Sequence, residues 1–119
     1  MIPETYTEIL ARSGRSLIDI GSDDIALPRL MALKAINALR GSNVVILGVD
    51  VIRINEGRPE YTYDNAHCEP EEYDSIDEYL KGSWDRIERY LIGYPDPLDG
   101  TISYALCVKD LTGSKTLWQ

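Results

Sequence analysis

The sequence predicts an α+β fold, in which a small antiparallel sheet packs against two to three helices. Two observations carry this prediction. Residues 43–68 contain two strand-like runs separated by a turn, and residues 76–92 carry apolar side chains at helical spacing. The length of 119 residues fits one compact domain, and no linker or internal repeat divides the chain. We therefore expect a single domain over residues 1–119.

The first 41 residues predict two helices joined by a connecting segment. Residues 4–12 place Tyr6, Ile9 and Leu10 on one side of a short helix, and residues 16–21 are expected to send their aliphatic side chains into the core. Pro28 is tolerated at the start of a helix, and Gly41 suits the position after its end. Between them an apolar stripe is predicted at Leu30, Leu33, Ile36 and Leu39.

The middle of the chain predicts a β-hairpin. Residues 43–54 are β-branched and apolar, residues 55–57 read Asn-Glu-Gly, and residues 59–68 return as a second strand. Pro59 has no backbone N–H, so its strand is expected to begin there or to lie at the sheet edge. Residues 101–109 predict a third, C-terminal strand.

The best-defined helix follows the hairpin. Ser75 and Glu78 have the spacing of a capping box, in which each side chain would bond the other residue's backbone N–H. Gly93 and Pro95 are expected to end the helix, and Gly82 inside it predicts close packing. The apolar stripe consists of Ile76, Tyr79, Leu80, Trp84, Ile87, Tyr90 and Leu91.

The charge distribution favours a protein partner. The net charge is −8, and residues 69–99 hold ten acidic and three basic residues. A negative field repels phosphate backbones and anionic lipids, so we expect no nucleic acid or membrane partner. The N-terminus has no secretory signal pattern, and two cysteines are few for a small secreted domain. We expect a cytoplasmic protein with Cys68 and Cys107 reduced and partly buried, although the sequence is also compatible with one disulfide.

Candidate catalytic and metal-binding residues are few. His67 and Cys68 are neighbours on a predicted strand, so their side chains would point to opposite faces and not form a dyad. With Asp64 they also lack the spacing of a zinc site, and no phosphate-binding glycine motif is present. Asp50 interrupts an apolar strand, so it is either a hydrogen-bonded structural residue, which we favour, or part of a functional surface. We expect no cofactor and no metal.

The acidic run before the long helix exceeds what helix capping needs. Glu69, Glu71 and Glu72 precede the capping residue, and Asp74 stands next to it. These side chains indicate a basic partner surface.

The order of several segments resembles the bacterial immunity protein 40 family, whose members are made beside polymorphic or contact-dependent inhibition toxins. The segments are Ile25-Ala26-Leu27, Val45 to Val51, Tyr61-Thr62-Tyr63-Asp64-Asn65, Cys68 and Ile76 to Leu80. The resemblance implies a cytosolic immunity protein, not an enzyme, that neutralises the C-terminal domain of a toxin, with nucleases as one class of target. The residues we expect to contact it are Tyr63, Asp64, His67, Glu69, Glu71, Glu72 and Asp74.

Two alternatives remain at this point. The first is an acidic regulatory or adaptor module that is unrelated to toxins. The second is a small enzyme that uses Asp50, Asp64 and Cys68, which would require a deep pocket lined by all three. Neither the oligomeric state nor the identity of a toxin follows from the sequence.

Overall fold

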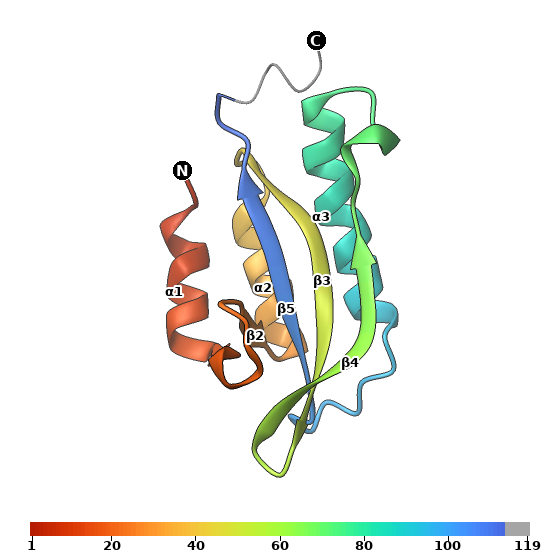
Figure 1. The fold of residues 1–119 in the computed structure, drawn as a ribbon. Coiled ribbons are helices and arrows are strands. Elements are labelled where there is room, and N and C mark those ends of the chain that lie inside the picture. Colours follow the sequence, from red (N-terminus) through yellow and green to blue (C-terminus); the bar gives the residue numbers. More distant parts are fainter. Residues whose placement is uncertain (114–119) are drawn as a thin grey trace.

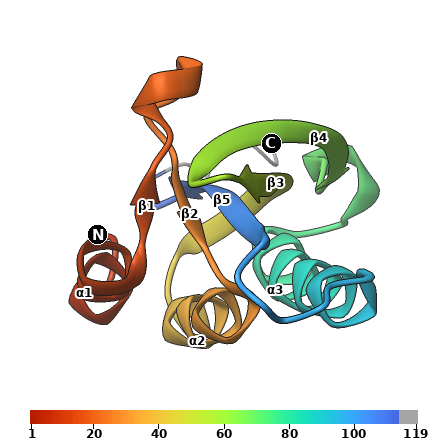
Figure 2. The same cartoon turned by 90° about the horizontal axis from the view of Figure 1, so that it is seen from below.

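The computed structural model describes residues 1–113, and three helices cover one face of a five-stranded antiparallel sheet (Figures 1 and 2). The elements are α1 (Glu4–Ser13), β1 (Arg15–Ser16), η1 (Ile18–Ile20), β2 (Ile25–Leu27), α2 (Arg29–Leu39), β3 (Val44–Asn55), β4 (Arg58–His67), η2 (Pro70–Glu72), α3 (Ile76–Gly93) and β5 (Ile102–Asp110). The strand order is β1-β2-β5-β3-β4. The predicted α+β class is confirmed. No helix within residues 1–113 combines the length and the apolar character that crossing a bilayer requires.

The β3–β4 hairpin turns where the sequence predicts it. Glu56 and Gly57 both have positive φ, 52° and 78°, which is the backbone of a type I′ two-residue turn. β5 pairs with β3 on its other side, so β3 is central and β4 is an edge strand. Pro59 therefore lies at the start of an edge strand, as expected.

The main core lies between the sheet and the helices. Val49 and Val51 of β3 pack there, and the helices contribute buried aliphatic side chains such as Ile36 and Ile87. A smaller apolar cluster lies on the opposite face of the sheet. It consists of Leu17, Ala26, Ile52 and Ala105, each at most 1% exposed.

The N-terminal third departs from the prediction in two ways. The predicted connecting segment begins with the last residue of the short strand β1, which pairs with β2, and neither strand was expected. Only Leu17 of this segment is fully buried, whereas Ile18 is 65% exposed. In α2, Leu30 is also 65% exposed, because the helix buries a face formed by Ala32, Ala35, Ile36 and Leu39.

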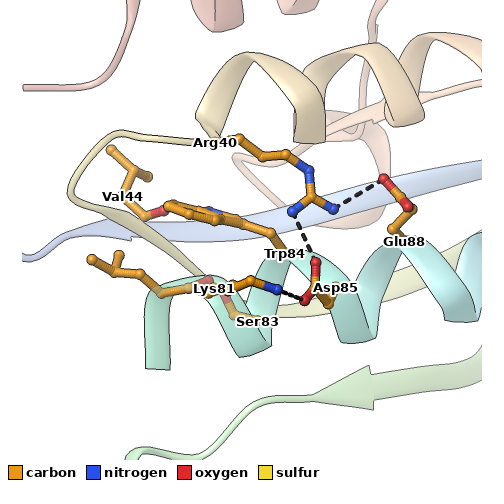
Figure 3. Close-up of polar contacts among 8 residues, drawn as sticks. Arg40, Val44, Lys81, Ser83, Trp84, Asp85 and Glu88 are labelled. Carbon is orange, nitrogen blue, oxygen red and sulfur yellow. Dashed lines mark hydrogen bonds and ion pairs between the residues drawn. The ribbon is translucent and has the colours of Figure 1, made fainter. Parts of the chain in front are cut away.

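Side chains of α3 replace a missing strand next to the beginning of β3. β4 pairs with β3 only from Gly48 onward, so Val44 and Ile46 have no strand partner on that side. The Ser83 hydroxyl accepts the Ile46 N–H at 3.0 Å. Trp84 Nε1 donates to the carbonyl of Val44 at 2.9 Å (Figure 3). Both side chains are buried, so α3 satisfies backbone groups that would be costly to leave unpaired.

An ion-pair network joins the end of α2 to α3. The Arg40 guanidinium lies 2.8 Å from Asp85 and 3.1 Å from Glu88, and Lys81 lies 2.6 Å from the other oxygen of Asp85 (Figure 3). The hydrogen bonds from Lys81 and then Arg40 hold the pKa of Asp85 below its usual value.

Candidate partner-binding site

The residues predicted to bind a partner follow one another along the second half of β4, through η2 and up to α3. Tyr63 is the most prominent of them, because its side chain is 84% exposed. Its φ of 69° coincides with a register shift between β3 and β4, where a β-bulge turns the edge strand. Exposed aromatic side chains of this kind are common at protein interfaces.

Asp64, which is predicted to contact a partner, also has a hydrogen-bonding partner within the chain. Its carboxylate accepts a hydrogen bond of 2.6 Å from the Tyr94 hydroxyl, which connects the edge strand to the end of α3. This hydrogen bond, together with burial, raises the pKa of Tyr94. Asp64 therefore has a structural partner, and its contact with another protein stays a prediction.

The acidic segment divides into structural and unpaired carboxylates. Glu72 accepts the Glu69 backbone N–H at 3.3 Å and lies 3.1 Å from Arg86 of α3. By contrast, Glu71 and Asp74 are exposed, and their carboxylates make no hydrogen bond or ion pair within residues 1–113. These two carboxylates are the ones available to a partner.

One of the two hydrogen bonds of the predicted capping box at α3 is present, and the other is not. Ser75 Oγ accepts the Glu78 N–H at 3.1 Å, as expected. Glu78 does not return to the Ser75 N–H; its carboxylate accepts the Asp74 N–H at 3.2 Å, one residue earlier. The side chains that cap α3 therefore bond backbone groups back to Asp74, one residue before the N-cap.

Aromatic packing fixes the acidic segment on α3. The Tyr73 ring lies 5.3 Å from the Tyr79 ring and covers Gly82, where an added Cβ would stand 2.2 Å from a Tyr73 ring carbon. The Tyr79 hydroxyl donates to the Cys68 carbonyl at 3.0 Å. The close packing predicted for Gly82 is confirmed, and it gives the acidic residues a defined position.

His67 lies between two recesses. The first, between β4 and α3, is lined by Asn65, Ala66, His67, Arg86, Arg89 and Tyr90. The second, at the end of β4, is lined by Leu47, His67, Cys68, Glu69, Pro70, Tyr79, Lys109 and Leu111. The arginines and Tyr90 were not predicted as site residues. Positions 86, 89 and 90 lie on one side of α3, because residues three and four apart are neighbours on a helix. This spacing indicates a shared site only once β4 is known to lie beside that side of the helix.

The two cysteines are not arranged for nucleophilic chemistry with His67. Both cysteines are free, but they differ from the partial burial predicted for each, because Cys68 is buried and Cys107 is exposed. Burial is the largest cause of the raised pKa of Cys68, which disfavours a thiolate nucleophile. Since His67 is exposed while Cys68 is buried, the two side chains lie on different sides of the strand, as expected.

Asp50 is not the hydrogen-bonded structural residue that we favoured. It is half-buried, and its carboxylate makes no hydrogen bond within the described chain. It stands two residues before Ile52, so it shares the sheet face opposite the helices. Asp64 instead bonds Tyr94 of the helix-side core, and Cys68 is buried. The geometry thus does not join Asp50, Asp64 and Cys68 in one site.

Comparison with known proteins adds one match. The family model for immunity protein 40 matches residues 16–108, which include every strand except the last residues of β5 and the first residue of β1. No curated protein matches the chain, and no solved structure does. In residues 1–113, no group of three or more His, Cys, Asp or Glu side chains could hold a metal ion.

Proposed function

Because the chain belongs to the immunity protein 40 family, we propose that it binds the C-terminal domain of a cognate toxin and neutralises it by occlusion. The family match is the observation that carries this proposal. We place the binding face on the second half of β4, on η2 and on the adjoining part of α3. The exposed Tyr63, the unpaired carboxylates and the two recesses beside His67 support this location.

The acidity of this face favours a basic toxin surface. Residues 69–99 account for most of the chain's net charge, since they hold ten acidic and three basic residues, and Glu71 and Asp74 are free to meet cations. Complementary charge accelerates association and excludes wrong partners. A nuclease domain with a positive cleft fits this chemistry, and covering either the cleft or a neighbouring surface would block it. Such an encounter is proposed to take place in the cytoplasm of the producing cell.

A growth assay tests the proposal directly. The toxin C-terminal domain encoded beside the chain's gene is expressed from an inducible promoter, with and without this chain. We expect the chain to restore growth and to bind the purified toxin domain in isothermal titration calorimetry. The control is a toxin domain of unrelated sequence, which the chain should neither bind nor neutralise. Failure to bind the cognate domain would overturn the proposal.

A further inference from the structure

The edge of β4 presents unpaired backbone groups at its second half. The Cys68 N–H donates to the Leu47 carbonyl at 2.9 Å, which places these two residues in a hydrogen-bonded pair. Hydrogen-bonded and non-hydrogen-bonded pairs alternate along an antiparallel ladder. Val49 and Ala66 therefore bond each other, whereas Asn65 and His67 turn their N–H and C=O groups away from β3.

The position of Gly48 supports this assignment. A Cβ added at Gly48 would stand 2.7 Å from the Ala66 carbonyl oxygen, so that oxygen points toward β3. The carbonyls of Asn65 and His67, on either side, consequently point outward. β4 is the last strand of the sheet, and no turn, loop or cap within residues 1–113 bonds these four outward groups.

The recess between β4 and α3 lies beside this open edge. Asn65, Ala66 and His67 form one wall, and Arg86, Arg89 and Tyr90 form the other. Arg86 is held by Glu72, but Arg89 is exposed and makes no ion pair with the described residues. A guanidinium without a partner in a recess suits a carboxylate, which it can bind with two parallel hydrogen bonds.

We propose that the β4 edge at Asn65 and His67 takes an extended segment of the toxin domain as a sixth strand, whose acidic side chain enters the recess and binds Arg89. In this mode of recognition, main-chain hydrogen bonds supply affinity, and recesses for individual side chains supply specificity. The inference rests on the proposed function and adds the form of the partner segment. A local acidic side chain at Arg89 is compatible with a toxin surface that is basic where it meets Glu71 and Asp74.

Two pairs of variants test the edge and the recess separately. Asn65→Pro removes an outward N–H, and proline is tolerated where that N–H does not bond the neighbouring strand. Its matched control is Asn65→Ala, because both variants lose the side-chain hydrogen bond from Asn65 to the Tyr63 carbonyl. Arg89→Glu reverses the charge in the recess, and Lys34→Glu makes the same charge change on the exposed side of α2.

The readouts are the Kd for the cognate toxin domain and the amide hydrogen exchange of Asn65 and His67. We expect Asn65→Pro to bind at least about tenfold more weakly than Asn65→Ala, which loses only the side-chain contacts. Arg89→Glu should weaken binding by roughly 30-fold or more, and Lys34→Glu should stay within about threefold of wild type. The two amides should exchange slowly only in the complex. Replacing the contacting acidic residue of the toxin by Arg should restore binding of Arg89→Glu.

Each outcome is decisive. If wild-type chain binds the toxin while the two amides stay unprotected, no strand is added and the inference is wrong, although the proposed function stands. If Arg89→Glu binds the toxin domain as tightly as Lys34→Glu does, no acidic side chain of the toxin binds Arg89. If Asn65→Pro does not fold, the exchange measurement on wild-type protein still decides on the strand. If wild-type chain does not bind the toxin domain, the proposed function and this inference both fall.

Discussion

Individual side chains of α3 satisfy backbone groups of β3 where no neighbouring strand pairs with it. Ser83 is fully buried in the middle of α3, and its hydroxyl both accepts the Ile46 N–H and donates to the Leu80 carbonyl at 2.8 Å. A serine in a helix interior is a modest helix former, so its position follows from the strand beside it. The sequence contains no local signal for this role, because the bond joins residues 37 positions apart.

Ser83→Ala should therefore destabilise the fold. The variant leaves the buried Ile46 N–H without an acceptor, and we expect the free energy of unfolding to fall by about 1–3 kcal/mol. Urea denaturation followed by tryptophan fluorescence measures the change. Ser103→Ala is the matched control, since Ser103 is also buried but its hydroxyl makes no hydrogen bond within residues 1–113. Equal losses in the two variants would show that the Ser83–Ile46 bond contributes nothing.

Asp50→Ala, unlike Ser83→Ala, should leave the stability of the fold nearly unchanged. Because its carboxylate has no hydrogen-bonded donor and is only half-buried, Asp50→Ala orphans nothing. We expect the free energy of unfolding to change by less than about 0.5 kcal/mol, as for other surface substitutions. The same urea titration measures it, with Ser83→Ala as the reference for a structural loss. A decrease above 1 kcal/mol would return Asp50 to the structural role inferred from the sequence.

At the scale of elements, local chemistry explains what could be predicted. The hairpin follows from its Glu56–Gly57 turn, and α3 follows from Ser75 and its apolar stripe, so both were predicted closely. β1 and β2 have two and three residues, too few to show alternation, and their pairing depends on contacts distant in sequence. Leu30 was placed in the core for a similar reason, since periodicity does not say which side of a helix meets the sheet.

The junction of α2 and α3 should be sensitive to acid. The hydrogen bonds from Lys81 and Arg40 hold the pKa of Asp85 below its usual value, so the folded state binds the proton less tightly than the unfolded chain. The resulting stability is fully present above the unfolded pKa of about 4 and is lost as the pH falls through the lower folded pKa.

Asp85→Asn should remove this part of the pH dependence. We expect the variant to have a lower Tm than wild type at pH 6, and the difference to shrink below about pH 4. Circular dichroism melts across this range provide the measurement. Asp19→Asn serves as the control, because Asp19 is exposed and makes no ion pair within the described chain. A Tm difference that is constant with pH would show that Asp85 does not contribute through its ionised form.

At the scale of the whole molecule, the shared surface of the acidic residues and Tyr63 could be predicted from the sequence, whereas the recess beside them could not. The acidic run and Tyr63 are local features, and they lie together because β4 leads directly into η2. The recess beside them needs Arg86 and Arg89, which stand more than 20 residues from Asn65 in the chain. Only the packing of α3 beside the edge strand brings these groups together, so no sequence pattern could have predicted the recess.

The acidic segment should control the rate of toxin binding. Glu71→Gln with Asp74→Asn removes two charges while keeping Glu72, which holds Arg86, and Glu69, whose backbone Glu72 caps. We expect the association rate to fall several-fold at low salt and its salt dependence to flatten, with a smaller change in the dissociation rate. Stopped-flow association with the cognate toxin domain at two salt concentrations measures this effect.

The control for this rate prediction is Asp19→Asn with Asp23→Asn, which removes the same charge from the segment around η1. That segment lies near the beginning of β4, at Arg58 and Pro59, whereas η2 follows the other end of the strand. Charges more than about 8 Å from the contact are screened at physiological ionic strength, so position should matter more than net charge. If both double variants slow association equally, the toxin responds to the net charge of −8 and not to the β4–η2 face. If neither does, the carboxylates of Glu71 and Asp74 do not steer the encounter, and backbone and side-chain contacts along β4 must account for binding.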